Sequence, residues 1–411
     1  MSYFIHFGCW NNENCYKNNA LSKVVNKISK LADKSNLKFL SVCGDNYYPP
    51  KEKTKDGGKK KSYIKANLIS GFQCLRNSVS KKIPIYMTYG NHDFEMDSNF
   101  ENIDDNCTIT NDQIKFSKLY NIKLELWQQA DFNTNTKLIF IDTSIYDNNK
   151  ICEYIKCYKS VKDIHKSIDI IRNQQNDFIR NVVKNIKQNL NINNIIIAGH
   201  HPLAYLKIKD KSKDKIKDKS KYKSKDTTKD TTKELKFEIL NTELNNLLFN
   251  DIYLQLKHIS NMNYYYLCAD LHQYQSGNIE ITNSINDDSM NIKQYIVGTG
   301  GAKLDPYYST LITDNEEYKK QNIKYKMNKD DIINSCSEYG FLKCIENIDN
   351  NIIFEFIKTD TIGIPILRRL TSKKTKRNTL GSRPKSAYVR RSARIRRPGS
   401  ISYRSRNVKS I

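Results

Sequence analysis

The sequence predicts an α/β fold, a layered sandwich built on two mixed sheets. Over the first half of the 411 residues, short apolar runs alternate with longer amphipathic ones, which is the order of β-α units with parallel crossovers. In the second half the apolar runs follow one another as hairpin strands do. Glycine and polar residues follow several apolar runs, at the strand ends where open α/β sheets carry their ligand sites.

The elements expected in the first half are strands and helices in turn. The strands are short apolar runs at 3–7, 39–42, 83–87, 122–126, 138–141 and 195–198. Three helices are expected between them because apolar residues recur at helical spacing over 21–31, 63–79 and 164–190. Further strands are expected in the second half at 264–268, 295–297, 341–345 and 352–357.

The positive charge is concentrated in two segments. The 68 Lys and Arg exceed the 44 Asp and Glu by 24. Residues 368–411 hold 16 of these surplus charges and no acid, and residues 207–236 hold another 7. The remaining body is therefore almost neutral, and the basic character belongs to appended segments.

Both basic segments are expected to be disordered. Residues 207–233 are a low-complexity repeat of Lys, Asp, Ser and Thr, which predicts an insertion between a strand and a helix. The expected organisation is thus one domain over 1–367 and a tail over 368–411. Arg-rich tails bind nucleic acid or other polyanions by counterion release, without reading sequence. A solvated tail with no dedicated partner is the alternative.

The expected location is intracellular. No run of about 18 apolar residues is present, and residues 1–10 do not resemble a signal peptide, so neither a transmembrane segment nor secretion is expected. The nucleus and a virion stay open. Frequent Asn, Lys and Ile are typical of an A+T-rich genome, such as that of a protist or a large DNA virus. The ten cysteines lack zinc-finger spacing and are expected to be reduced, although Cys152 and Cys157 are close enough for a loop disulfide.

Candidate metal ligands follow five of the expected strands. The five segments are Phe7-Gly8-Cys9-Trp10, Gly44-Asp45-Asn46-Tyr47-Tyr48, Tyr89-Gly90-Asn91-His92-Asp93, Gly199-His200-His201-Pro202 and Asp270-Leu271-His272. Each places donor side chains beside a small residue, where the backbone can approach a bound ion closely. Asp, Asn, Tyr and His from several strand ends suit two metal ions bridged by one carboxylate. Each segment alone is also what an ordinary turn contains, so the ordered set carries the argument.

This ordered set resembles the motifs of the calcineurin-like metallophosphoesterases, and most closely those of the tartrate-resistant type of purple acid phosphatase. That branch reads Gly-Asp-Asn-Phe-Tyr at the second segment. The segments Phe140-Ile141-Asp142-Thr143 and Val297-Gly298-Thr299-Gly300-Gly301 are similar to later parts of the family pattern. The resemblance covers about residues 3–367. It implies a four-layer α/β/β/α sandwich of two mixed sheets.

The resemblance also implies roles for individual residues. Asp45 would bridge two metal ions. Tyr48 and His272 would bind the first ion, and Asn91 and His200 the second. His92 would bind the substrate phosphate and protonate the leaving oxygen, and His201, beside a ligand, is a second candidate for substrate contact.

Two ligand positions depart from the family pattern. Cys9 stands where the family has Asp, and Asp270 stands where it has His. A thiolate from Cys9 favours zinc or ferrous iron over ferric iron, whereas an oxygen ligand from Asp270 admits manganese or magnesium. The ligands of both ions can still be completed, with the metal open among Fe, Zn and Mn.

The expected function is that of a dinuclear-metal phosphatase. It would hydrolyse a phosphorylated substrate, most readily a monoester, with metal-activated water. The alternative is a catalytically impaired pseudo-phosphatase that serves as a binding or structural protein, with a basic tail that binds nucleic acid. Neither the substrate nor the oligomeric state is predicted. Nearby polar residues have structural explanations: His6 as a packed or surface residue, and Asp93 and Asp142 as residues that hold turns and ligands in place.

Overall fold

The computed structural model describes most of the chain before residue 360. The described residues are 1–32, 36–53, 59–95, 107–147, 156–157, 167–189, 191–210, 233–239, 242–282, 288–305, 317–327, 338–347 and 351–359. By compactness the chain divides into two units, Met1–Thr361 and Ile362–Ile411, and every described residue belongs to the first. The tail predicted for 368–411 therefore lies outside the described residues. Among the helices of the described part, none is both long and apolar enough to cross a membrane.

The first sheet has six strands in the order β18-β17-β1-β2-β5-β6. Their bounds are β1 (Tyr3–Phe7), β2 (Leu37–Cys43), β5 (Ile85–Thr88), β6 (Lys123–Leu124), β17 (Gly340–Glu346) and β18 (Ile352–Lys358). The strands β1, β2, β5 and β6 run parallel, whereas β17 and β18 add an antiparallel pair next to β1. The sheet is mixed, and its parallel part comes from the β-α half of the sequence.

The second sheet has eight strands in the order β15-β16-β13-β14-β12-β9-β8-β7. Their bounds are β7 (Gln128–Asp131), β8 (Thr136–Phe140), β9 (Asn194–Ala198), β12 (Asn263–Cys268), β13 (Tyr274–Thr282), β14 (Ser289–Val297), β15 (Glu317–Lys320) and β16 (Ile323–Met327). The central strands β8, β9, β12 and β14 are parallel, and the strands at both edges pair antiparallel. This sheet is mixed as well.

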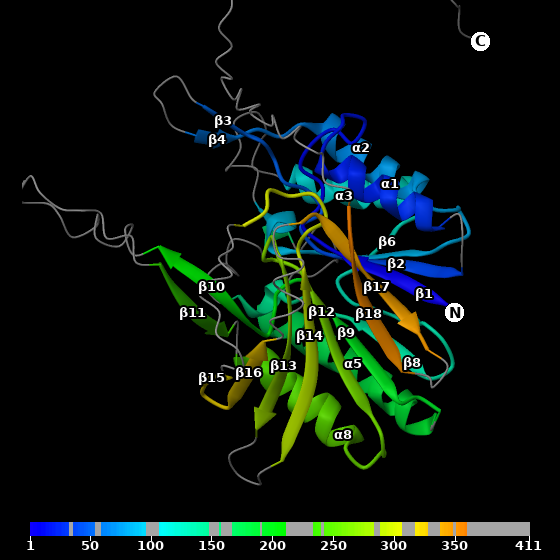
Figure 1. The fold of residues 1–411 in the computed structure, drawn as a ribbon, viewed down its shortest axis with the longest axis vertical. Helices are drawn as coiled ribbons and strands as arrows, with labels where there is room; N and C mark the ends of the chain where they lie inside the picture. The colour runs from blue at the N-terminus through cyan, green and yellow to red at the C-terminus, as the bar shows by residue number, and fades with distance from the viewer. Residues whose placement is uncertain are drawn as a thin grey trace, which may run out of the picture. The chain divides into compact units, whose positions relative to one another are not determined.

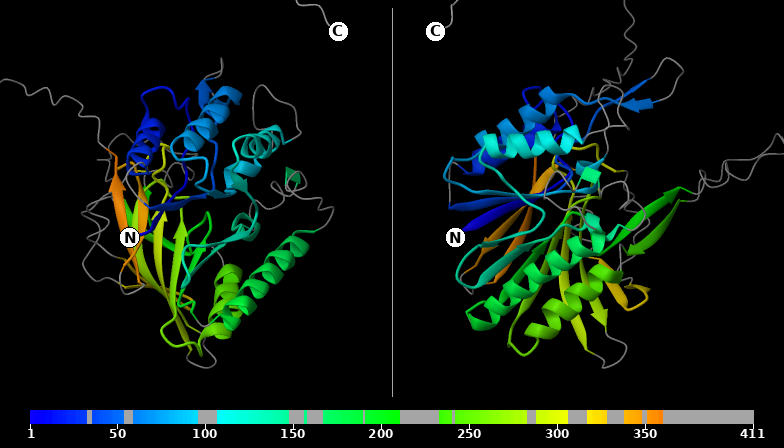
Figure 2. Two further views of the ribbon diagram at one scale, coloured as in Figure 1. Left: turned by 90° about the vertical axis from the view of Figure 1, so that its right-hand side faces the viewer. Right: turned by 180° about the vertical axis from the view of Figure 1, so that it is seen from behind.

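Helices cover the outer face of each sheet. The helices are α1 (Ala20–Ala32), α2 (Lys65–Asn77) and α3 (Thr108–Leu119) on one side, and α5 (Ile168–Gln188), α7 (Thr242–Leu247) with the π-helical turn η4 (Leu248–Tyr253), and α8 (Leu254–Leu256) on the other. Figures 1 and 2 show α1, α2 and α3 over the first sheet and α5 with α8 over the second. The predicted four-layer α/β/β/α sandwich of two mixed sheets is confirmed.

Aromatic side chains join the inner faces of the two sheets. Phe354 of β18 stacks on Tyr295 of β14 with ring centroids 4.3 Å apart, and it contacts Tyr265 of β12 at 4.9 Å. Phe356 lies 4.4 Å from Tyr274. Such pairs contribute about 0.5–1.5 kcal/mol each beyond the apolar area they bury. The apolar stripe predicted for α1 forms part of the same core, because Leu21, Val24, Val25 and Ile28 are all buried.

Two short hairpins stand outside the large sheets. They are β3 (Lys51–Lys53) with β4 (Lys59–Lys61), and β10 (Ala204–Asp210) with β11 (Lys233–Ile239). The Lys-rich segment expected at 207–233 begins within β10 and ends at β11, so it connects two paired strands. The expectation of a strand-to-helix connection was wrong, because the antiparallel register continues through Asp210 and Lys233. Residues 211–232 lie outside the described residues.

One disulfide corrects the expectation of reduced thiols. Cys107 and Cys157 are bonded, with an S–S distance of 1.96 Å and 50 residues of separation. Closeness in the sequence suggested Cys152 as the partner of Cys157, but pairing follows proximity in the fold. Cys152 lies outside the described residues. The other six cysteines in the described part of the chain are free.

Candidate metal centre

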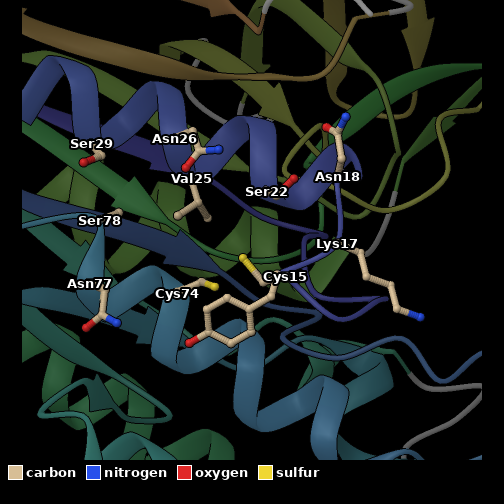
Figure 3. A pocket seen from close by; sticks show the side chains of 11 residues that line it. Cys15, Lys17, Asn18, Ser22, Val25, Asn26, Ser29, Cys74, Asn77 and Ser78 are labelled. Carbon is tan, nitrogen blue, oxygen red and sulfur yellow. The ribbon is translucent and has the colours of Figure 1, made fainter. Parts of the chain in front are cut away.

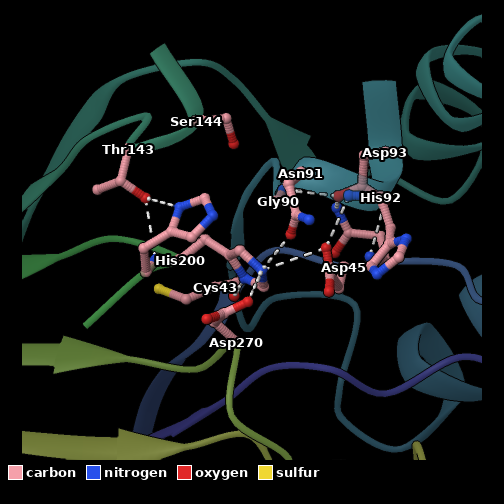
Figure 4. A network of polar contacts seen from close by, with 12 residues as sticks. Cys43, Asp45, Gly90, Asn91, His92, Asp93, Thr143, Ser144, His200 and Asp270 are labelled. Carbon is pink, nitrogen blue, oxygen red and sulfur yellow. Dashed lines mark hydrogen bonds and ion pairs between the residues drawn. The ribbon is translucent and has the colours of Figure 1, made fainter. Parts of the chain in front are cut away.

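The nine predicted site residues come from the carboxyl ends of five parallel strands. The strands β1, β2 and β5 belong to the first sheet, and β9 and β12 to the second, so the site lies where the ends of both sheets meet. Figure 4 shows Asp45, Asn91, His92, His200 and Asp270 around one centre. The structure brings together every predicted residue, although the contacts alone do not assign a metal to any of them. Two mixed sheets can meet this way because parallel strands end on the same edge.

Three of these residues have an unusual backbone conformation. Cys9, Asp45 and Asp270 have φ values of 53°, 50° and 58°, and each is the second residue after the end of its strand. The left-handed region costs about 1–2 kcal/mol for residues with a Cβ, and such strain collects at functional sites. The neighbouring Gly44 is also left-handed, with φ of 74°.

Gly90 allows the closest backbone approach in the centre. A Cβ on Gly90 would lie 2.3 Å from Oδ1 of Asp45 and 2.9 Å from a ring carbon of His200. Any other residue would push these side chains away. Gly90 is therefore required by close packing around Asp45, and Gly44 by its close approach to Gly90 and His200.

The two carboxylate oxygens of Asp45 face different groups of donors. Its Oδ1 lies 3.2 Å from Nε2 of His200 and accepts the backbone N–H of His92 at 3.1 Å. Its Oδ2 accepts the hydroxyl of Tyr48, whose oxygen lies 2.9 Å from Nε2 of His272. Asp45 is 1% exposed. The buried Asp45 carboxylate therefore lies between two sets of donors.

The backbone fixes the orientation of His200 and His272. Nδ1 of His200 donates to the carbonyl of Cys43 at 2.9 Å, and Nδ1 of His272 donates to the carbonyl of Lys303 at 2.7 Å. In both rings Nε2 is left to face the centre. Asn91 Oδ1 lies 3.1 Å from Nε2 of His200, and Asp270 Oδ1 lies 3.8 Å from it. An imidazole held through one nitrogen is the usual arrangement of a metal-binding histidine.

The charges of the centre favour a cation. Burial acts to raise the pKa of Asp45, but His200 and His92 outweigh it and lower that pKa. Burial acts to lower the pKa of His200, while the carboxylates of Asp45 and Asp270 raise it to about 9. The ionised carboxylates thus stabilise positive charge at this position. A metal ion bound there would supply that charge in place of the proton on His200.

Cys9 and Tyr48 complete the side of the centre near His272. Cys9 is fully buried, and Tyr48 packs against the small cluster that contains it. Burial and the nearby Asp45 carboxylate raise the pKa of Cys9 and that of Tyr48. Both groups bind a metal only after they lose a proton, and a cation beside them would favour that loss.

His92 lies at the edge of the centre and is oriented by Glu95. Its side chain is 30% exposed, and its Nδ1 lies 2.6 Å from Oε1 of Glu95, which also pairs with Lys61. Burial acts to lower the pKa of His92, but Asp45 and Glu95 raise it overall. Glu95 and Lys61 were missed in the sequence, although a Glu three residues after His92 is a usable signal for such a pair.

His201 lies deeper than His92. It is 4% exposed, its Nδ1 lies 2.8 Å from the hydroxyl of Thr143, and its ring packs against that of His200 at 4.9 Å. Burial lowers the pKa of His201 to about 4. Thr143 also accepts the backbone N–H of His201. This contact ties the end of β8 to the segment after β9.

Asp93 supports the loops without facing the centre. Its carboxylate accepts the backbone N–H groups of Asn46 and Gly90, both at 2.8 Å, and the side chains of Asn46 and Gln113, both at 3.0 Å. Burial and the charge of Asp45 raise the pKa of Asp93 to about 7. The expectation that Asp93 holds turns in place agrees with these contacts.

Two groups of donors in the described residues can hold metal ions. One consists of Cys9, Asp45 and His272, and the other of His200, His201 and Asp270; within each group the ligand atoms lie within 4.8 Å of one another. Tyr48 contacts members of the first group and Asn91 contacts His200 of the second. The mixture of oxygen, imidazole and thiol donors fits first-row transition metals.

Layered mixed sheets with clustered metal donors at their strand ends define a class of metal-dependent hydrolases. The model of the calcineurin-like phosphoesterase family matches residues 3–242. Because this match covers more than half of the chain, the protein belongs to the calcineurin-like phosphoesterase family. Its activity class is therefore metal-dependent phosphoester hydrolysis.

Known structures resemble the chain at low sequence identity. GAP50, described as the anchor in the inner membrane complex of Plasmodium, is 13% identical over 88% of this chain and 85% of its own, with a TM-score of 0.39. PhoD is 10% identical over 87% and 70%, with a TM-score of 0.43. The phosphopantetheinyl hydrolase of Mycobacterium tuberculosis is 9% identical over 73% and 90%, with a TM-score of 0.31. No curated protein sequence matches. These similarities carry no function to this chain.

Proposed function

We propose that the protein is a dinuclear-metal phosphatase that hydrolyses phosphate monoesters. One observation carries the proposal: the two oxygens of the buried Asp45 carboxylate face two separate groups of donors. Within the family, this geometry supports a pair of ions that share one ligand. Cys9, Tyr48 and His272 would hold one ion, and Asn91, His200 and Asp270 the other, with Asp45 between them.

Two ions at these positions would polarise a phosphoryl oxygen and lower the pKa of a bound water. The protein's own contribution is orientation. The carbonyls of Cys43 and Lys303 hold His200 and His272 with Nε2 inward, and Asp93 fixes the loops that carry Asp45 and Asn91. Because these groups are held before substrate arrives, little free energy is spent on ordering them.

His92 is the residue best placed to contact the substrate. Its Nδ1 is engaged by Glu95, so Nε2 is the nitrogen free to face a phosphate at the edge of the centre. The nearby carboxylates raise its pKa, which favours the protonated ring. A protonated His92 binds a phosphate oxygen and donates its proton to the leaving oxygen. The burial of His201 and its contact with Thr143 favour a role in holding His200 over contact with substrate.

The donors Cys9 and Asp270 set the expected metals. A buried thiolate near one ion favours zinc or ferrous iron, and the carboxylate of Asp270 near the other admits manganese as well. Ferric iron, which Tyr48 alone would favour, is less compatible with a neighbouring thiolate. We therefore expect zinc, ferrous iron or manganese in the purified protein.

The variant Asp45→Asn tests the bridge. It keeps the shape of the side chain and removes the charge that both ions would share. We expect the metal content to fall from about two ions per chain and the hydrolysis of an aryl phosphate monoester to fall by about 10²-fold or more. Elemental analysis and aryl-phosphate turnover measure the two effects on the same preparation.

Asp251→Asn is the matched control, because Asp251 pairs with Arg180 on the other side of the second sheet. It should keep both metal and turnover. Unchanged metal content in Asp45→Asn would reject the bridging assignment. Two bound ions in the parent without turnover of mono- or diesters would favour the impaired pseudo-phosphatase, and turnover of diesters alone would correct the substrate class.

A role of the basic tail in binding nucleic acid is a separate proposal. The observation behind it is the charge of 368–411, with 16 Lys and Arg and no acid. Such a segment binds polyanions by charge alone and would act without the metal centre.

A further inference from the structure

A second site lies on the helical side of the first sheet. A cavity of about 480 Å³ lies between the loop that follows β1, helix α1 and the end of helix α2 (Figure 3). Its walls include Cys15 and Cys74, along with Tyr16 and Ser78. None of the nine predicted residues of the metal centre lines this cavity.

The cavity brings two thiols close together. Cys15 comes from the loop before α1 and Cys74 from the last turn of α2, both line the cavity, and each thiol shifts the pKa of the other. Figure 3 shows both sulfur atoms at the cavity wall. Tyr16 lines the same cavity, and it also lowers the pKa of Cys74.

These interactions make the two thiols unequal. The interaction with Cys15 lowers the pKa of Cys74 against the opposing effect of burial, with a further contribution from Tyr16. The interaction with Cys74, together with burial, raises the pKa of Cys15. Cys74 is therefore the thiol that more readily becomes a thiolate, and the thiolate is the reactive form.

The pair also differs in access from other free cysteines of the described part of the chain. Cys9, Cys43, Cys268 and Cys344 have no exposed surface, whereas Cys15 is 4% exposed and Cys74 is 8% exposed at a cavity wall. A small reagent can reach the pair without unfolding of the core. Access, proximity and unequal thiols together are the features of a redox-sensitive site.

We propose that Cys74 and Cys15 form a dithiol that hydroperoxides oxidise to a disulfide. The Cys74 thiolate attacks one peroxide oxygen, so that an S–O bond forms, the O–O bond breaks and the second oxygen leaves as water after taking a proton. Cys15 then attacks the sulfur of the Cys74 sulfenic acid, an S–S bond forms, and the hydroxide leaves with the proton of Cys15 as water. Two thiols are oxidised and one hydrogen peroxide is reduced to two waters.

Oxidation would fasten the loop after β1 to helix α2. The backbone N–H of Cys15 already donates to the hydroxyl of Ser70 at 3.1 Å, and the side chain of Asn11 donates to the carbonyl of Leu68 at 3.3 Å. The carbonyl of Asn11 accepts the backbone N–H of Tyr48 at 2.7 Å. The disulfide would add a covalent bond between this loop and α2, which already contact each other. The same loop carries Cys9.

The test is oxidation of the full-length protein with hydrogen peroxide in stoichiometric steps. Digestion without reduction, followed by mass spectrometry, should show a peptide that links Cys15 to Cys74 before Cys9, Cys43, Cys268 or Cys344 is oxidised. In Cys15→Ser the Cys74 sulfenic acid has no partner, so a dimedone adduct should accumulate at Cys74. In Cys74→Ser no such adduct should form at Cys15.

Two further variants serve as controls for misfolding and for general reactivity of the cysteines. Tyr16→Phe removes a hydroxyl that lowers the pKa of Cys74, at a residue that is 65% exposed, and it should slow the oxidation several-fold without unfolding the protein. Cys344→Ser should behave like the parent. If the parent keeps both thiols at peroxide doses that oxidise the other cysteines, or if the adduct forms at Cys15, the proposal is wrong.

Discussion

Three predicted ligands share a left-handed backbone, and one of them is not a residue that this conformation favours. Asp tolerates positive φ because its short polar side chain can bond to the local backbone. Cys9 has no such compensation, yet its φ of 53° matches the 50° of Asp45 and the 58° of Asp270. The turn after β1 therefore has the same backbone conformation as the turns that carry Asp45 and Asp270. This geometry keeps the Cys9 sulfur among the donors despite the changed side chain.

His6 is a buried histidine whose role is structural. It has no exposed surface, its Nδ1 lies 3.0 Å from the hydroxyl of Ser41, and burial lowers its pKa to about 3. The prediction of a packed histidine was right, and the surface alternative was wrong. A neutral ring in the core makes stability depend on pH.

The expected pH effect follows from the lowered pKa. Below pH 6.5 the unfolded chain takes up a proton at His6 that the folded chain does not, so stability is complete above that pH and is lost as pH falls toward 3. The parent should therefore lose about 3 kcal/mol more than His6→Gln in free energy of unfolding between pH 7 and pH 4. Denaturant unfolding at the two pH values measures this difference.

The matched control is His258→Gln, since His258 is exposed. This variant should follow the pH profile of the parent. Equal losses in the parent and in His6→Gln would mean that His6 does not remain neutral in the folded protein.

At the scale of elements, helix α3 connects the disulfide to the support of the metal centre. Cys107 precedes the first residue of α3, and Gln113 and Thr110 of this helix make hydrogen bonds to Asp93. The disulfide to Cys157 closes a loop of 50 residues at the start of the helix. The first half of α3 is therefore held by both the disulfide and the hydrogen bonds to Asp93.

Loss of the disulfide should lower stability. Cys107→Ser and Cys157→Ser should each reduce the free energy of unfolding by roughly 2–4 kcal/mol, because the unfolded chain gains the freedom of the opened loop. The double variant should equal each single variant, since either change removes the same bond. Denaturant unfolding measures all three. Strictly additive losses would show that the two thiols are not bonded in solution.

At the scale of the whole molecule, we propose that the charge of the tail and the chemistry of the body are separable. Every predicted ligand precedes residue 273, and 16 of the 24 surplus charges follow residue 367. The predicted division into a catalytic body over 1–367 and a basic tail over 368–411 makes the two activities independent.

Deletion from Arg368 onward tests this division. We expect metal content and aryl-phosphate turnover to stay within about twofold of the parent, because all nine site residues remain. Affinity for duplex DNA should fall, and the slope of log affinity against log salt should become shallower by roughly 0.9 for each phosphate that the tail neutralises in the parent. Binding across a salt series, together with turnover, measures both. Loss of turnover with unchanged DNA affinity would place the tail within the catalytic fold.

The sequence by itself determined the order of β-α units, the family and the positions of the candidate ligands. It could do so because parallel strands must end in turns on one edge, and small or polar residues mark those turns. The sequence did not predict the elements that bury polar side chains. Helix α3 buries Thr110, Asp112 and Gln113 against its neighbours, and β13 buries Gln275 and Ser276, so neither shows a clear apolar pattern.

Only the tertiary structure decided which groups meet. Cys107 and Cys157 are bonded because the fold places their sulfurs together across 50 residues, and Cys15 meets Cys74 for the same reason. The direction of each Asp45 oxygen depends on left-handed turns and on two glycines that let the strand ends approach. Spacing along a chain specifies which donors are available, but distances of about 3 Å between them result from the packing of two sheets against each other.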